Sequence, residues 1–310
     1  MDNAQLRTAE DCATGPIRAA ALFHPDVSHS YLEAFEGADA DISLVEHLDD
    51  DTTFTAALVF GGDGTIHRHL RPLIERKIPL LPVPVGSGND FAAALGIGTV
   101  RDALSAWQAF CSGAANVREM DVGLIRAGQK LETYFCNIAG LGLDSEANRL
   151  ANAMPRWLRR HGGYILAALR AIVSFRPAVV TIDNGNQAGP SIAQPAMLVA
   201  IANTTSYGGG MRIAPRAQLA DGLLDVCVVR RVGRGRLLRS FPRVFRGEHL
   251  AMPEVEYFQS ASLRIAAERP LEVYADGEFI CQTPCEISAV PRALRVIVPS
   301  AQRDDEQYRC

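Results

Sequence analysis

Short apolar runs alternate with helix-spaced apolar positions along the first third of the chain. One of these runs is apolar at every position and ends at a pair of glycines, which is typical of a central strand in a parallel sheet. Strands that alternate with helices predict an α/β unit. The predicted strands cover residues 19–23, 41–45, 56–60 and 79–85, and the predicted helices cover 65–76, 89–95 and 100–110.

The pattern changes near residue 116. From there strand-like runs predominate, and glycine turns such as Asp183-Asn184-Gly185 and Asp276-Gly277 separate them. Such a pattern is typical of an antiparallel sandwich, here interrupted by a pair of helices between residues 146 and 175. The predicted strands cover residues 120–125, 133–138, 178–182, 196–201, 224–229, 262–266, 271–275 and 294–298.

Composition agrees with a folded protein of two domains. The 310 residues are 48% hydrophobic and 21% charged, which excludes a disordered or fibrous chain. No apolar run reaches the roughly 18 residues that a membrane-spanning helix needs, and residues 1–10 lack the apolar segment of a signal peptide. The seven cysteines are odd in number and scattered, which favours a reducing compartment. We therefore expect a cytoplasmic protein.

Charge is distributed unevenly along the chain. The net charge of −4 argues against nucleic acid as a partner. Residues 149–182 nevertheless hold six arginines and no acid, and residues 221–250 hold seven arginines and three acids. These segments indicate either contact with an anionic membrane surface or helix faces that are merely solvated. Trp157 lies among Arg156, Arg159 and Arg160, and an aromatic ring beside arginines is common at a lipid interface. A packed surface helix is an equally good interpretation.

Two glycine-rich loops each follow a predicted strand and open a predicted helix. The first is Gly61-Gly62-Asp63-Gly64-Thr65, and the second is Gly86-Ser87-Gly88-Asn89-Asp90. Backbone N–H groups in such loops can approach phosphate oxygens, and the helix N-terminus favours an anion, although a tight turn is the simpler alternative for either loop alone. Both loops should lie side by side at the carboxyl edge of the sheet, where ligands bind in open α/β folds.

Two acidic turns lie in the second half of the chain. Asp221-Gly222-Leu223-Leu224-Asp225 offers turn carboxylates and carbonyls that suit a hard cation such as Mg²⁺, or it forms a plain hairpin. Asp276-Gly277-Glu278 offers paired acids for general-base chemistry, although Asp-Gly is also a common hairpin turn. His67 and His69 are two apart on a predicted helix and point to different faces, which argues against a metal pair.

Taken in order, these motifs resemble the diacylglycerol kinase catalytic-domain family, above all its soluble bacterial lipid kinases, with sphingosine and ceramide kinases as relatives. The resemblance runs from about residue 19 to 299 and includes the segments Phe135–Ala147 and Tyr207–Pro215. It implies a Rossmann-like α/β nucleotide-binding domain with a parallel sheet, followed by a β-sandwich lipid-binding domain, with the last strand returning to the first domain. The expected boundaries are 1–116 with 292–310, and 117–291.

The resemblance also implies an ATP- and Mg²⁺-dependent kinase of phospholipid metabolism that phosphorylates diacylglycerol or a similar lipid alcohol at the membrane surface. A homodimer is a further expectation. Asp276 and Glu278 match the acids that activate the lipid hydroxyl. The nucleotide contacts implied are Gly61, Gly62, Asp63, Gly64, Thr65, Ser87, Asn89 and Asp90.

The metal sites are likewise implied by the resemblance. Asp221, with the backbone carbonyls of Gln218 and Leu223, matches the ligands of a structural Mg²⁺. Asp121 matches an acid that orders water around the catalytic Mg²⁺.

Three departures from the family pattern lie on the nucleotide side. His67 and Arg68 replace a usual Asn-Glu pair, Ala93 replaces a usual arginine, and His24 replaces a usual asparagine. Two alternatives therefore stay open at this point. One is a lipid-binding relative that has lost ATP, and the other is a kinase of a soluble alcohol such as NAD.

Overall fold

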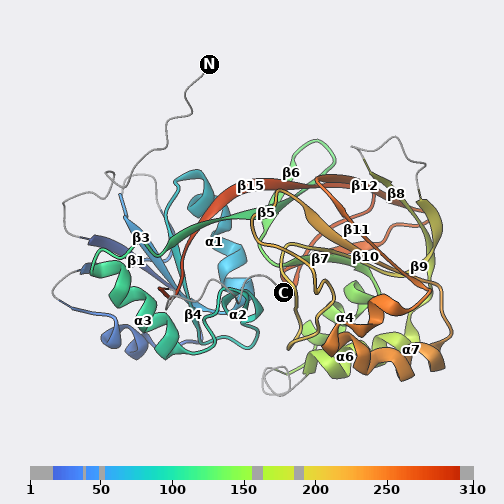
Figure 1. Cartoon of the computed structure of the whole chain (residues 1–310), viewed down its shortest axis with the longest axis horizontal. Coiled ribbons are helices and arrows are strands. Elements are labelled where there is room, and N and C mark those ends of the chain that lie inside the picture. The colour runs from blue at the N-terminus through green and yellow to red at the C-terminus, as the bar shows by residue number, and fades with distance from the viewer. Residues whose placement is uncertain (1–16, 38–39, 49–52, 156–162, 185–191, 301–310) are drawn as a thin grey trace.

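The computed structural model describes residues 17–37, 40–48, 53–155, 163–184 and 192–300. Two lobes lie side by side and share one continuous sheet (Figure 1). Among the described residues, none of the helices combines the length and apolar character needed to cross a bilayer.

The N-terminal lobe is a parallel sheet with helices packed on it. Its strands lie in the order β4-β3-β1-β2, and β3 is buried at every position, as its apolar run predicts. Helix α3 begins at a capping box in which Thr99 and Asp102 exchange hydrogen bonds. The elements are β1 (Ile17–Phe23), η1 (His29–Ala34), β2 (Ala40–Leu44), β3 (Ala56–Gly61), α1 (Asp63–Glu75), β4 (Leu80–Pro84), α2 (Asp90–Ala94) and α3 (Val100–Cys111).

The C-terminal lobe is built from antiparallel strands, with helices covering one side (Figure 1). Its strands are β5 (Val117–Ala127), β6 (Leu131–Phe135), β7 (Ile138–Gly142), β8 (Ala178–Asn184), β9 (Ile192–Ala202), β10 (Leu224–Arg230), β11 (Val255–Ser260), β12 (Ser262–Ala267), β13 (Glu272–Ala275), β14 (Glu278–Gln282) and β15 (Cys285–Ile297). Its helices are α4 (Leu143–Asn152), α6 (Tyr164–Ser174), α7 (Arg234–Ser240), η3 (Phe241–Arg246) and η4 (Glu248–Ala251).

Strand β15 joins the two lobes. Its first half pairs antiparallel with β12, and β5 pairs antiparallel with both of its halves. Val296 near its end pairs parallel with Leu80 of β4. The expected return of the last strand to the first domain is confirmed. Because β5 and β15 each contribute side chains to the cores of both lobes, the domain boundaries stated above stay a prediction.

Two predicted strands were wrong in their extent, and two strands were missed. Residues 133–138 do not form one strand, because the chain turns at Cys136 and Asn137 between β6 and β7. The last strand begins at Cys285, much earlier than the predicted residue 294, and β11 and β14 were not predicted at all. These segments mix apolar and charged residues, and pairing with neighbouring strands decides their conformation.

Candidate active site

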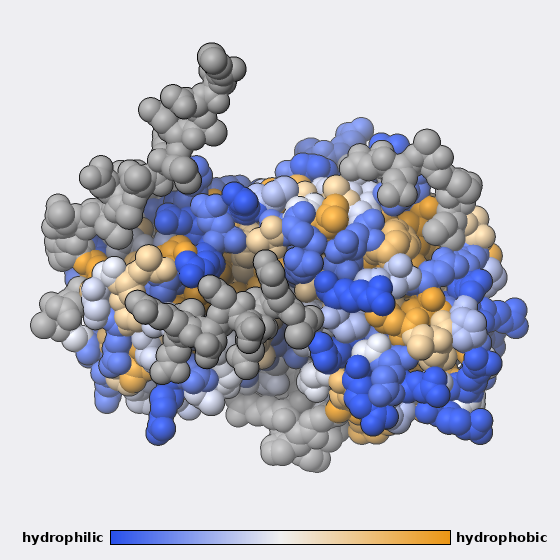
Figure 2. Space-filling view, in the orientation of Figure 1, coloured by the Kyte–Doolittle hydropathy of each residue, from blue (hydrophilic) through white to orange (hydrophobic). Residues whose placement is uncertain are grey.

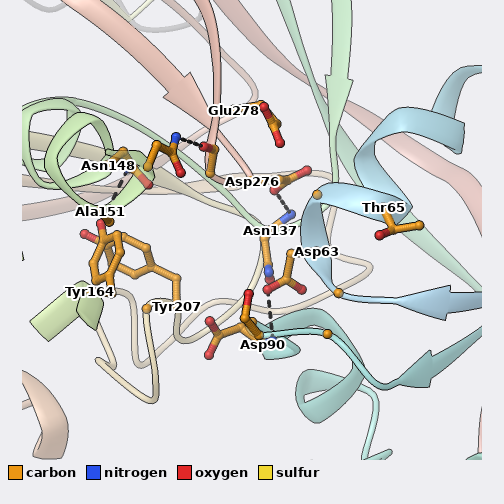
Figure 3. A pocket seen from close by; sticks show the side chains of 18 of the residues that line it. Asp63, Thr65, Asp90, Asn137, Asn148, Ala151, Tyr164, Tyr207, Asp276 and Glu278 are labelled. Atoms are coloured by element: carbon orange, nitrogen blue, oxygen red, sulfur yellow. Dashed lines mark hydrogen bonds between the residues drawn. The ribbon is translucent and has the colours of Figure 1, made fainter. Parts of the chain in front are cut away.

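A cleft of about 400 Å³ lies where the two lobes meet (Figure 3). The two glycine loops line it from the N-terminal lobe. The turn between β13 and β14 lines it from the C-terminal lobe, together with α4 and the start of α6. The motifs that the sequence separates by more than 200 positions are thus brought to one cavity.

The two glycine loops pack directly against each other. A Cβ atom on Gly62 would lie 2.2 Å from the carbonyl oxygen of Gly88, and one on Gly86 would lie 2.4 Å from the backbone nitrogen of Gly62. The N–H of Asp63 donates to the Gly88 oxygen at 3.0 Å. Glycine is required here because the backbones themselves are in contact. The predicted side-by-side placement is confirmed.

Asp63 serves as the cap of the neighbouring helix as well as part of the first loop. Its carboxylate accepts hydrogen bonds from the N–H groups of Asp90 and Phe91, at 3.1 and 3.0 Å, at the start of α2. Burial, with the nearby charges of Asp90 and Asp276, raises the pKa of Asp63 to about 7. A cleft carboxyl with such a pKa can exchange protons at neutral pH.

Replacing Asp63 with asparagine should change the pH dependence of stability. Because burial raises the pKa of Asp63 from 3.8 to about 7, the wild-type protein loses folding free energy as pH rises between these values. An asparagine side chain at this position has no such ionisation. The free energy of unfolding of Asp63→Asn relative to wild type should therefore increase by roughly 2–3 kcal/mol between pH 5 and pH 8. Urea unfolding at both pH values measures it.

The matched control is Asp41→Asn, at an exposed position of β2. This variant should follow the wild-type pH dependence. A pH-independent difference between Asp63→Asn and wild type would contradict the raised pKa of Asp63.

The second loop is held in shape by its own side chains. The Asn89 side chain accepts from the Gly86 N–H and donates to the Gly86 carbonyl, both at 3.2 Å. Ser87 and Asp90 line the cleft, and Asp90 lies near the N–H of Gly209. Burial raises the pKa of Asp90. Asn89 therefore shapes the loop, whereas Ser87 and Asp90 are placed to meet a ligand.

The remaining residues of the first loop are Gly61, Gly64 and Thr65. Thr65 is buried, and its hydroxyl has no hydrogen-bond partner among the described residues. A Cβ atom on Gly61 would lie 2.3 Å from that hydroxyl, and one on Gly64 would lie 3.0 Å from a carboxylate oxygen of Glu278. Gly64 and Glu278 thus face each other across the cleft.

Asp276 sits at the tip of the β13–β14 hairpin. Asp276 and Gly277 both have positive φ, 50° and 87°, as a tight two-residue turn requires. The carboxylate accepts from the N–H groups of Cys136 and Asn137 at 3.0 and 2.9 Å. These contacts fix the carboxylate and explain why the chain bends between β6 and β7. Figure 3 shows Asp276 beside Asn137, facing Asp63.

The residues expected to bind metal lie away from the cleft lining. Asp121 is fully buried, and its carboxylate accepts from the N–H groups of Gly222 and Arg292 at 2.6 and 2.8 Å. Asp221 accepts from the Leu223 N–H and from the side chain of Gln259. The oxygen donors of Asp221, Gln218 and Leu223 are of the type that Mg²⁺ prefers. Both metal roles stay predictions.

Several cleft residues were missed by the sequence reasoning. Asp144 at the start of α4 is buried and accepts from the hydroxyls of Tyr164 and Tyr207, at 2.8 and 2.5 Å. Burial raises the pKa of Asp144. Asp144 lies in one of the sequence motifs, but the two tyrosines come from other segments of the chain (Figure 3). No local sequence signal therefore indicated that Asp144 contacts them.

An apolar cavity of about 80 Å³ adjoins the cleft. Asp144, Tyr164 and Tyr207 line both spaces. Aliphatic, aromatic and methionine side chains make up most of its remaining lining, including Ile172, Leu198, Met211, Ile213, Phe241 and Met252. The site therefore combines a polar cleft with an adjoining apolar cavity.

Two family models together match most of the chain. The diacylglycerol kinase catalytic domain matches residues 18–125, and the YegS C-terminal NAD kinase beta sandwich-like domain matches residues 137–298. A diacylglycerol kinase of Mycobacterium tuberculosis is 36% identical over 246 residues, which is 79% of this chain and 77% of that protein. A diacylglycerol kinase of Bacillus subtilis is 28% identical over 81% of this chain and 80% of that protein.

Solved structures share the fold. A crystal structure of a diacylglycerol kinase from Bacillus anthracis superposes with a TM-score of 0.65 at 20% identity, over 91% of this chain and 96% of that one. An NAD kinase from Archaeoglobus fulgidus in complex with ATP gives a TM-score of 0.51 at 14% identity, over 92% and 94%. The expected α/β and β-sandwich architecture is confirmed. With paired glycine loops facing an acidic hairpin, and with both family models matched, the chain is a kinase that belongs to the diacylglycerol kinase family.

Proposed function

We propose that this protein transfers the γ-phosphoryl group of Mg²⁺-ATP to the hydroxyl of diacylglycerol or a similar lipid alcohol. The observation that carries the proposal is the shared lining of the two cavities. The polar cleft, with its glycine loops, opens beside an apolar cavity, so one ligand could present a hydroxyl to the first and a hydrocarbon chain to the second.

The N-terminal side of the cleft suits a triphosphate. The loops at 61–65 and 86–90 place backbone groups and the start of α1 toward the cavity, and Arg68 is the one lysine or arginine among the described lining residues. The NAD kinase structure with the same fold is itself a complex with ATP.

The charge of the cleft supports a need for Mg²⁺. Among the described residues that line it, six are acidic and only Arg68 is a lysine or arginine. A polyphosphate would meet repulsion in such a cavity unless a divalent cation accompanied it. When bound, the ion would neutralise charge on the transferring phosphoryl group. The acidic residues are Asp26, Asp63, Asp90, Asp144, Asp276 and Glu278.

The acceptor side favours a lipid over a soluble alcohol. The apolar cavity offers a sugar or a nucleotide almost no hydrogen-bond partner. Burial of hydrocarbon there stabilises a bound lipid by about 25 cal/mol per Å². In the proposed reaction Asp276 accepts the proton of the lipid hydroxyl, and the oxygen then attacks the γ-phosphorus. Glu278, across from Gly64, assists at the edge of the cleft.

Purified protein should transfer label from γ-³²P-labelled ATP to diacylglycerol in mixed micelles, and EDTA should abolish the transfer. A panel with monoacylglycerol, ceramide, sphingosine and NAD defines the acceptor. Label on NAD alone would favour the soluble-alcohol alternative. No label on any acceptor from ATP, GTP or CTP, with no thermal stabilisation by Mg²⁺-ATP, would favour the lipid-binding alternative.

We also propose that the surface formed by α6 and α7 docks on an anionic membrane. The two helices pack side by side, and Leu166, Val173 and Leu238 are exposed on them. Arg234 and Arg239 are exposed and form no ion pair within the described residues, whereas Arg236 pairs with Glu254. Figure 2 shows mainly hydrophilic surface over these helices, with apolar patches between. Trp157, Arg156, Arg159 and Arg160, which supported this idea in the sequence, lie outside the described residues.

Arg234→Ser combined with Arg239→Ser should weaken binding to vesicles that contain phosphatidylserine by at least tenfold. Each basic residue near an anionic surface is worth about 1 kcal/mol, and this attraction fades within about 10 Å at 0.1 M salt. Co-sedimentation at several salt concentrations measures the effect. The control is Arg18→Ser with Arg101→Ser, at exposed positions of β1 and α3 on the other lobe. Equal binding to neutral vesicles, or indifference to salt, would contradict docking by charge.

A further inference from the structure

The Asp276 side chain forms hydrogen bonds with both the N-terminal lobe and the C-terminal lobe. Its side chain has no exposed surface, and Oδ1 is already engaged by the Asn137 N–H. The other oxygen, Oδ2, accepts from the Cys136 N–H and lies 3.1 Å from Nδ1 of His67. The carboxylate of Asp276 is thus held by two backbone donors, by the Cys136 thiol at 3.6 Å and by the His67 ring.

His67 reaches this carboxylate from the first turns of α1. That helix begins at the glycine loop, so one element positions both the phosphate-facing backbone and the imidazole. The His67 side chain is 11% exposed and bridges two elements that lie 209 residues apart in the chain. A side chain that only filled space would need no nitrogen at this point, and Asp276 already has two backbone donors.

The charges around His67 come from both lobes. Asp276 and Glu278 of the β13–β14 hairpin are negative, while Arg68 on α1 is positive. Burial by itself would lower the pKa of His67, but the hydrogen bond and charge of Asp276, with Glu278, outweigh it and raise the pKa. The pKa of the His67 imidazole therefore lies above its usual value of 6.5.

We propose that His67 is a positioning residue for Asp276: its Nδ1–H fixes Oδ2, and its protonation state sets the pH range in which Asp276 accepts the proton of the acceptor hydroxyl. This deepens the proposed function and rests on it. With imidazolium, the carboxylate is held in an ion pair. With neutral imidazole, the same hydrogen bond orients the carboxylate without a positive charge beside it.

Two substitutions separate the orientation of Asp276 by His67 from the titration of His67. His67→Asn places an amide nitrogen near the position of Nδ1, so it can donate to Asp276 but does not ionise. It should keep the maximal kcat and move the acidic limb of the kcat–pH profile, whereas Asp63, whose pKa burial raises to about 7, still titrates near Asp276. His67→Phe keeps the ring and removes the donor, and it should lower kcat by about tenfold or more, with KM for ATP nearly unchanged. His47→Asn, at an exposed histidine, is the control.

An independent measurement does not need the kinase reaction. Proton titration of His67 by NMR, with labelled histidine, should show its pKa falling in Asp276→Asn relative to wild type. An unchanged His67 pKa in Asp276→Asn overturns the pairing, whether or not the protein phosphorylates lipid. An acidic limb that stays at the wild-type position in His67→Asn, or normal kcat in His67→Phe, overturns the positioning role. Absence of any kinase activity in the wild type would count against the proposed function alone.

Discussion

Asp276→Asn should reduce turnover by about 10²–10⁴-fold, the usual worth of a general base. Asparagine is nearly the same size as aspartate but cannot accept a proton in the pH range of the assay. The amide oxygen can still accept the Asn137 N–H, while the amide nitrogen meets the Cys136 N–H, which also donates. A loss of stability of about 1–3 kcal/mol should accompany the loss of activity.

Measuring kcat together with urea unfolding keeps these two effects apart. Asp183→Asn, in the exposed end of another hairpin strand, is the matched control and should change neither quantity. Glu278→Gln, at an exposed position of the same hairpin, should cost less than Asp276→Asn because its side chain is solvated. A folded Asp276→Asn protein with near-normal kcat would move the base to Asp63 or Glu278.

Gly62→Ala should abolish most nucleotide binding and lower stability by about 1–3 kcal/mol. The added methyl group would lie 2.2 Å from the Gly88 carbonyl oxygen, which is a backbone atom and cannot rotate away. The two loops must then separate, and the N–H of Asp63 would lose its contact with Gly88. Because this contact positions both loops at the cleft, affinity for Mg²⁺-ATP should fall at least tenfold.

Calorimetric titration with Mg²⁺-ATP measures the affinity of Gly62→Ala. Gly98→Ala is the control, because its Cβ would meet the nearest atom, an oxygen of Asp102, at an ordinary 3.7 Å. Gly64→Ala is an informative intermediate. Its Cβ would lie 3.0 Å from a Glu278 oxygen, which belongs to a flexible side chain. Wild-type affinity in Gly62→Ala would show that loop contact does not shape the nucleotide site.

Much of the N-terminal lobe and both glycine loops could be predicted because their signals are local. An all-apolar run identified β3, helical spacing identified α1 and α3, and the Asp276-Gly277 pair identified a hairpin turn. Each signal lies within a few residues along the chain, and backbone geometry converts it directly into a strand, a helix or a turn. The parallel sheet then requires that both loops meet at one edge.

Tertiary structure alone decided the contacts that give the cleft its chemistry. The Asp63 carboxylate accepts a hydrogen bond from the start of a helix 27 residues away, and His67 is hydrogen-bonded to Asp276, 209 residues away. Asp144 accepts a hydrogen bond from a tyrosine hydroxyl 63 residues away. The bend between β6 and β7 depends on the same distant Asp276. Periodicity and turn composition carry no information about such partners, because the contacts form only when segments far apart in the chain fold together, within one lobe or between the two, and bury the carboxylates. This burial raises the pKa of Asp63 and of Asp144.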